Sequence, residues 1–93
     1  MTSFVKQEAI TSGQTFTYTG SVEENDFRNF TTHNVSVSGA GSATVTVNFG
    51  EDNESLGAIA SGTSDSFYCP GAINIIVTAV SDDITVSIFS YTE

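Results

Sequence analysis

Apolar and polar residues alternate with a period of two along most of this chain, and the period of 3.6 expected for a helix is absent. The clearest run spans residues 43–49, in which every second residue is apolar and the intervening residues are Thr or Asn. Such a run predicts a strand with one buried and one solvated face. A shorter alternating run, 35–37, lies upstream, and the segment 39–41 between them has the composition of a turn. The two runs therefore predict a β-hairpin.

A second pair of alternating runs lies near the C-terminus. Residues 73–80 and 84–91 are rich in Ile and Val and are separated by the turn segment 81–83. Ile76 and Val80 add apolar side chains to the second face of the first run, which indicates a central or covered strand. These runs predict a second hairpin.

Shorter alternations at 15–19, 56–60 and 67–69 predict three further strands, and Gly20 and Pro70–Gly71 are turn signals after two of them. About seven to eight short strands with turns roughly every ten residues predict an all-β fold, namely an antiparallel β-sandwich or jelly-roll.

The length of 93 residues fits one domain. We assign residues 13–93 to a single β-sandwich domain and interpret residues 1–12 as an edge strand or as an arm that reaches outside it. The acidic segment 22–30 fits no strand template. We expect a loop or a single helical turn there, which would place Phe27 or Phe30 on the core.

Charge narrows the range of partners. The formal net charge is −9, and Lys6 and Arg28 are the only cations. Such a chain cannot form the basic face that nucleic acids or anionic membranes require, so we expect neither partner. Charged residues make up only 14% of the chain, and Ser and Thr take their place. The resulting surface is polar but weakly charged, and it can be dehydrated against a protein partner at little cost.

Cys69 is the single cysteine, so an intrachain disulfide is impossible. No segment is apolar enough to predict a secretory signal or a membrane span. We therefore expect the chain to be made and folded in a cytoplasm.

Candidate chemistry is sparse. Acidic residues cluster in the predicted loops around Glu23, Glu51 and Asp82, and paired loop carboxylates can bind calcium, but none follows a calcium-loop pattern. A glycosidase pair of carboxylates would need a cleft, and the chain has no Trp to stack a sugar. His33 and Cys69 are interpreted as structural residues of the core or its edge. We expect no catalytic residues, no metal site and no cofactor, and hence a protein that is not an enzyme.

Protein contact is the remaining function class. Tyr residues are common at interfaces because they combine an apolar ring with a polar tip. Tyr68 has the opposite parity to its apolar neighbours, which predicts an exposed ring. We expect interface residues at Tyr18 and Tyr68, and at Phe4 and Val5 in the N-terminal segment.

The stretches 45–47, 60–63, 72–79 and 84–88 together resemble the small β-sandwich proteins of tailed-phage particles, including capsid decoration (cement) proteins. This resemblance covers roughly residues 35–91. It implies a virion protein, assembled in the host cytoplasm, that stabilises the shell by binding the major capsid protein or another virion protein, often as a homotrimer. The alternatives are a carbohydrate- or calcium-binding β-sandwich module, a tail or fibre component, or a small hydrolase.

Overall fold

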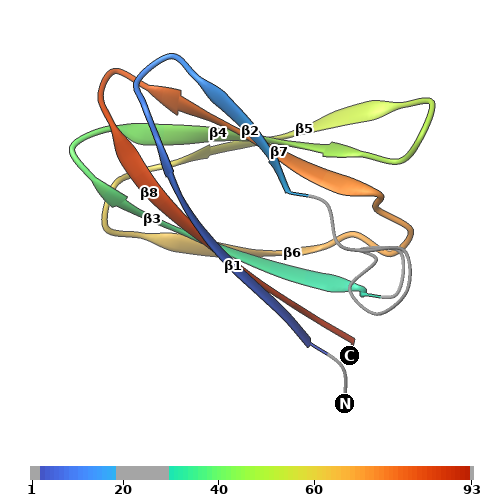
Figure 1. Cartoon of the computed structure of the whole chain (residues 1–93). Coiled ribbons are helices and arrows are strands. Elements are labelled where there is room, and N and C mark those ends of the chain that lie inside the picture. Colours follow the sequence, from blue (N-terminus) through green and yellow to red (C-terminus); the bar gives the residue numbers. More distant parts are fainter. Residues whose placement is uncertain (1–2, 19–29, 93) are drawn as a thin grey trace.

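The computed structural model describes residues 3–18 and 30–92, which form eight strands. They are arranged as two four-stranded antiparallel sheets, with orders β1-β8-β3-β6 and β2-β7-β4-β5, packed face to face (Figure 1). The strands are β1 Ser3–Ile10, β2 Thr15–Tyr18, β3 Thr32–Gly39, β4 Ser42–Asn48, β5 Asn53–Ile59, β6 Ser64–Tyr68, β7 Asn74–Val80 and β8 Ile84–Tyr91. Within the described ranges, no helix has the length and apolar character needed to cross a membrane.

The chain order within the sheets is that of a jelly roll. Most connections cross from one sheet to the other, whereas β4 and β5 are neighbours in the same sheet. Both predicted hairpins are therefore wrong, because β3 and β4 lie in opposite sheets, as do β7 and β8. The predicted strands are present, and β7 and β8 are central strands. Sequence alternation shows which face of each strand is apolar, but two strands that bury those faces can pair edge to edge or oppose each other across the core.

The core lies between the inward faces of the two sheets. Every second residue of the central strands is buried there, as in Val35 of β3, Val45 of β4, Val77 of β7 and Val86 of β8, each 0% exposed. Burial of these apolar side chains is the main stabilising contribution to such a fold. The full set of buried apolar residues is Ile10, Tyr18, Phe30, Val35, Val37, Ala43, Val45, Val47, Ile59, Cys69, Ala72, Ile75, Val77, Ala79, Ile84, Val86 and Ile88.

The β3–β4 and β7–β8 connections lie against each other at one end of the sandwich (Figure 1). The backbone amides of Ala40 and Gly41 both donate to the Asp83 carbonyl, at 3.2 and 3.3 Å. A Cβ atom at Gly41 would lie 2.7 Å from the Val80 carbonyl oxygen, which is closer than real Cβ atoms come. Glycine is therefore needed at residue 41 for the two connections to stack.

Residues 3–10 form β1, which pairs with β8 without interruption from Ser3 opposite Tyr91 to Ile10 opposite Ile84. Of the two interpretations of the N-terminal segment, the structure has the edge strand. Phe30 is fully buried, whereas Phe27 and the rest of the predicted loop lie outside the described residues.

Candidate interaction surface

The outer face of the β1-β8-β3-β6 sheet carries large apolar side chains in the open. Residues directly opposite each other on antiparallel strands share a face. Phe89 of β8 is opposite Val5 of β1, while Tyr91 of β8 and Tyr68 of β6 are both opposite Thr32 of β3. We call Val5, Tyr68, Phe89 and Tyr91 the apolar patch. It occupies two adjacent rows of the sheet, at the end that contains the C-terminus of β8.

Three side chains of the apolar patch are exposed, and Tyr91 is half-buried. Tyr68 and Val5 are 69% and 68% exposed, and Phe89 is 42% exposed. The rings of Phe89 and Tyr91 lie together, with centroids 5.3 Å apart. They lie outside because Ile84, Val86, Ile88 and Ser90 occupy the inward face of β8, so the alternate residues of the strand point outward.

No charged side chain lies on this outer face among the described residues. The acidic side chains described lie in turns, on edge strands or on inward-facing positions at strand ends. An apolar patch in uncharged surroundings loses little hydration energy when a partner covers it. The outward residues of the sheet are Val5, Gln7, Ala9, Thr32, Asn34, Ser36, Ser38, Ser64, Ser66, Tyr68, Thr85, Ser87, Phe89 and Tyr91.

The four residues expected at an interface do not all lie on one surface. Val5 and Tyr68 lie on this same outer face, but on its two opposite edge strands, and Phe4 is the neighbour of Val5 in β1. Tyr18 does not lie on a surface: it is 1% exposed and its hydroxyl donates to the Val86 carbonyl across the core, at 3.2 Å. Burial, and secondarily the Glu8 carboxylate, raise the pKa of Tyr18. Its alternation with Thr15 and Thr17 was the available signal for an inward ring.

Sequence reasoning missed Phe89 and Tyr91 as surface residues. The signal was present, because both are out of phase with the buried Ile residues of the same strand. The predicted strand 84–91 included both residues, but neither was assigned to a face.

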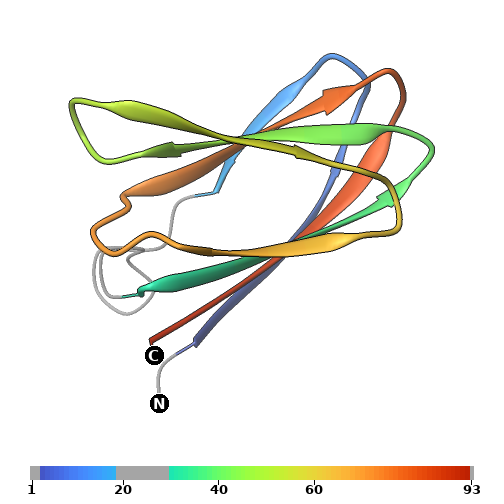
Figure 2. The same ribbon diagram turned by 180° about the vertical axis from the view of Figure 1, so that it is seen from behind.

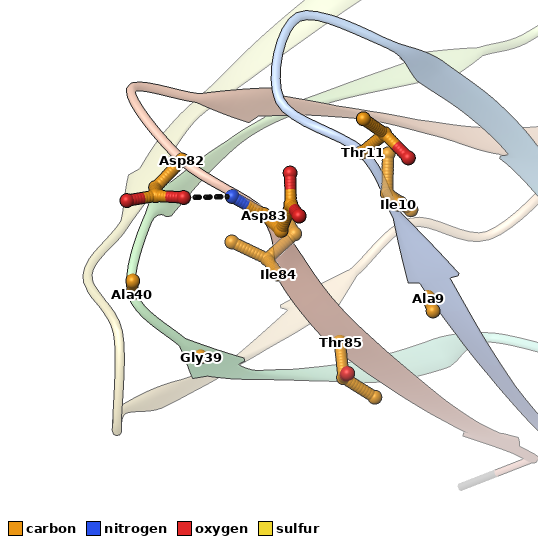
Figure 3. A pocket seen from close by; sticks show the side chains of 9 residues that line it. All are labelled: Ala9, Ile10, Thr11, Gly39, Ala40, Asp82, Asp83, Ile84 and Thr85. Carbon is orange, nitrogen blue, oxygen red and sulfur yellow. Dashed lines mark hydrogen bonds between the residues drawn. The ribbon is translucent and has the colours of Figure 1, made fainter.

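Two of the three predicted acidic loops are described, and they do not converge; the loop around Glu23 lies outside the described residues. Asp82 and Asp83 border an open hollow of about 370 Å³ beside the β1–β2 connection (Figure 3). Both carboxylates already accept backbone hydrogen bonds, from Asp83 N at 2.9 Å and from Ser12 N at 2.8 Å respectively. Glu51 and Asp52 lie in the β4–β5 turn at the opposite end of the sandwich (Figure 2). Within the described ranges, no three His, Cys, Asp or Glu side chains are grouped to hold a metal ion.

His33 and Ser90 form a buried polar pair between β3 and β8. Both are 0% exposed, and His33 Nδ1 lies 2.7 Å from Ser90 Oγ. Burial lowers the pKa of His33 to about 4, so the ring is neutral at pH 7. Because solvent does not reach this hydroxyl, the pair tethers two strands and is not an accessible nucleophile. Cys69 is a buried free thiol, as expected, and burial followed by the Glu54 charge raises its pKa.

Comparisons with known proteins identify the fold. No protein-family model and no curated protein sequence matches this chain. Among solved structures, RmlC from Streptococcus suis aligns with a TM-score of 0.63 at 11% identity, over 99% of this chain and 45% of that one. This chain therefore spans less than half of the length of RmlC.

Two further structures match over nearly their whole lengths. A de novo designed double-stranded β-helix aligns with a TM-score of 0.55 at 12% identity, over 94% of this chain and 97% of that one. The SPBc2 prophage-derived protein YomS aligns with a TM-score of 0.56 at 16% identity, over 94% of each chain. At these identities the likeness concerns the fold alone. It confirms the prediction of an all-β fold, with two antiparallel sheets packed as a β-sandwich.

Proposed function

We propose that this chain is a non-enzymatic virion structural protein. More specifically, we propose a capsid decoration (cement) protein. It would bind the major capsid protein, or another protein of the same particle, and stabilise the shell. The observation that carries it is the apolar patch, which lies on an uncharged sheet face.

The patch has the properties of a docking surface. Covering exposed apolar surface contributes about 25 cal/mol per Å². The Ser, Thr and Asn side chains around the patch are hydroxyls and amides that can bond to a partner's backbone, and no charge has to be desolvated. The acidic side chains at the ends and edges of the sandwich favour approach to a basic protein surface.

The phage part of the proposal has separate support. The sequence resembles small virion proteins over residues 35–91, and a protein of similar fold and size derives from a prophage. The non-enzymatic part rests on the placement of ionisable groups, since His33 is buried against Ser90 and the described carboxylates are dispersed. The homotrimer implied by the resemblance stays a prediction.

The test uses the phage that encodes the chain, with this gene deleted. Purified protein is added to the deletion mutant's heads, and binding is measured by co-sedimentation. We expect binding of the wild type, and at least about tenfold weaker binding of Phe89→Ser and Tyr68→Ser. Phe49→Ser is the matched control, because Phe49 is similarly exposed (37% against 42%) but lies beyond the end of β4.

Three results would count against the proposal. One is the absence of the chain from purified wild-type virions. Another is binding that is unaffected by both patch substitutions. The third is equal loss of binding in Phe49→Ser, which would mean that any exposed ring contributes.

A further inference from the structure

The free edge of β1 differs from the other sheet edges. Exposed edge strands attract other strands unless they are short, bulged or charged on the inward side. β2 has four residues, and β6 has five with Asp65 on the inward side opposite Val35. The register of β5 shifts between Val45 and Thr46 of its neighbour, and its Gly57 has a φ of 97°. Each of these three edges has a feature that discourages pairing.

β1 is neither short nor bulged, although Lys6 and Glu8 lie on its inward side, opposite Ile88 and Val86 of β8. It is eight residues long, contains neither Gly nor Pro, and keeps an unbroken register with β8. Its outer backbone edge has no partner among the described strands, and it lies at the front of the molecule in Figure 1. An unbroken edge of this length is suited to accept a further antiparallel strand.

The charges on β1 indicate which strand it accepts. Lys6 is the one Lys or Arg within residues 3–18 and 30–92, and Glu8 lies two residues further along the same face of the same strand. Opposite charges directly across an antiparallel pair are stabilising, and like charges are destabilising. A strand carrying Lys and Glu at this spacing is complementary to itself when it runs in the opposite direction.

We propose that β1 pairs antiparallel with β1 of a second copy of this chain, about a two-fold axis through Gln7. Lys6 then faces Glu8 of the partner subunit, and Glu8 faces Lys6 of the partner subunit. Val5 faces Ala9 of the partner subunit on the outer side of the sheet. The result is an isologous dimer with one continuous eight-stranded sheet, whose outer face joins the two uncharged faces.

The neighbouring registers are disfavoured. In any other register, residues that face each other must still lie on the same side of the sheet. The two-fold axis can therefore pass only through another residue of β1. An axis through Lys6 places this residue opposite Lys6 of the partner subunit, and an axis through Glu8 places the two Glu8 carboxylates together. Only the axis through Gln7 pairs both charges favourably.

The first test reverses the charges and measures molecular mass by sedimentation from about 10 µM to about 1 mM. The wild type is expected to approach twice the monomer mass of 9.8 kDa. Lys6→Glu and Glu8→Lys are each expected to raise the dimer dissociation constant at least about tenfold, since each places like charges together twice. The double variant is expected to recover the wild-type value, and an equimolar mixture of the two single variants is expected to form a heterodimer.

This design separates specific pairing from general repulsion. If the net charge alone controlled association, Glu8→Lys would dimerise more strongly than the wild type and Lys6→Glu less strongly. That pattern, a wild type that is monomeric throughout, or a stable trimer would each overturn the proposal. Circular dichroism of every variant checks that the β fold is kept.

The second test fixes the register. Gln7→Cys places two thiols across the axis, where directly opposed Cα atoms lie about 4.5–5.5 Å apart, within the range of a disulfide. We expect rapid oxidation to a covalent dimer. Val5→Cys is the control, because the two copies of residue 5 would be about 13 Å apart along the strands. Equal cross-linking of both variants would overturn the register.

Discussion

The outer faces of the two sheets are built from different residues. Neither carries a charged side chain among the described residues. The β1-β8-β3-β6 sheet exposes the apolar patch, whereas the β2-β7-β4-β5 sheet exposes mainly Thr, with Val80 (37% exposed) at the end of β7. On the second sheet, Thr15 and Thr78 bond to each other across two strands at 2.8 Å. The remaining Thr residues of that face are Thr17, Thr44 and Thr46.

The difference distinguishes surface residues that stabilise the sheet from surface residues that are available to bind a partner. Thr suits a pleated surface because of its branched Cβ, and it can satisfy its hydroxyl within the sheet. An exposed ring such as that of Tyr68 contributes little to the fold, because most of its surface stays in water. The two sheets differ on their inner sides as well, since His33 and Ser90 lie under the first sheet while the inward residues of β4 and β7 are apolar.

Both faces depend on the stacked connections that join the sheets, and the largest effect is expected there. Gly41→Ala places a methyl group against the Val80 carbonyl, so one connection must move. We expect a loss of about 3 kcal/mol in the free energy of unfolding, measured by urea denaturation. Ala40→Ser is the control, because Ala40 is exposed. A Gly41→Ala protein as stable as the wild type would mean that the two sheets are joined differently.

The buried histidine should make the stability of the first sheet sensitive to pH. Burial lowers the pKa of His33 to about 4 in the folded chain from about 6.5 in the unfolded chain, so the unfolded chain binds more protons between these values. Stability therefore falls as the pH is lowered through this window. The expected loss from pH 7 to pH 5 is about 2 kcal/mol, measured by urea denaturation at each pH.

His33→Gln supplies the comparison for this effect. Gln keeps a hydrogen-bonding group near Ser90 but cannot titrate, so its stability should change much less between pH 7 and pH 5. An equal fall in both proteins would assign the pH dependence to other groups.

Local patterns in the sequence were sufficient for the strands but not for their pairing. The alternation in residues 43–49 and 84–91 identified strands and inward faces, because burial of one face imposes a period of two. Whether consecutive strands pair or cross depends on how the turn at residue 41 packs against a turn 40 residues later. No local pattern records that contact.

Only two of the four residues of the apolar patch, Val5 and Tyr68, were predicted from the sequence, for a related reason. Val5 was chosen from its position and Tyr68 from its parity, but their common face depends on β8 and β3, which lie between β1 and β6 in one sheet. Tyr18 was misplaced because its hydroxyl could have bonded to a partner or to the core. The acceptor it uses, the Val86 carbonyl, is 68 residues away in the chain.

Smaller effects should separate the two faces directly. Thr15→Ala removes one hydroxyl of the Thr15–Thr78 pair and should cost about 1 kcal/mol in urea denaturation. Tyr68→Ser should change the free energy of unfolding by less than about 0.5 kcal/mol, because 69% of the side chain is exposed. A larger loss for Tyr68 than for Thr15 would give the apolar patch a structural role and weaken the docking proposal.

The smallest effect is expected from adding calcium, because the described acidic turns lie at opposite ends of the sandwich and away from both outer faces. Calcium needs six to eight oxygen ligands from converging groups. Asp82 and Asp83 instead accept backbone hydrogen bonds at one end of the sandwich, while Glu51 and Asp52 lie at the other. Millimolar calcium should therefore change the melting temperature by no more than about 1 °C, measured by calorimetry with and without chelator.

Asp83→Asn sharpens this last measurement, because the amide oxygen can still accept from Ser12 while the charge is removed. The variant should melt close to the wild type and be equally indifferent to calcium. A rise of several degrees in the wild type, reversed by chelator and lost in Asp83→Asn, would assign a cation site to this end of the sandwich. Asp82 and Asp83 would then bind a cation. A calcium-binding module would replace the virion protein as the favoured function.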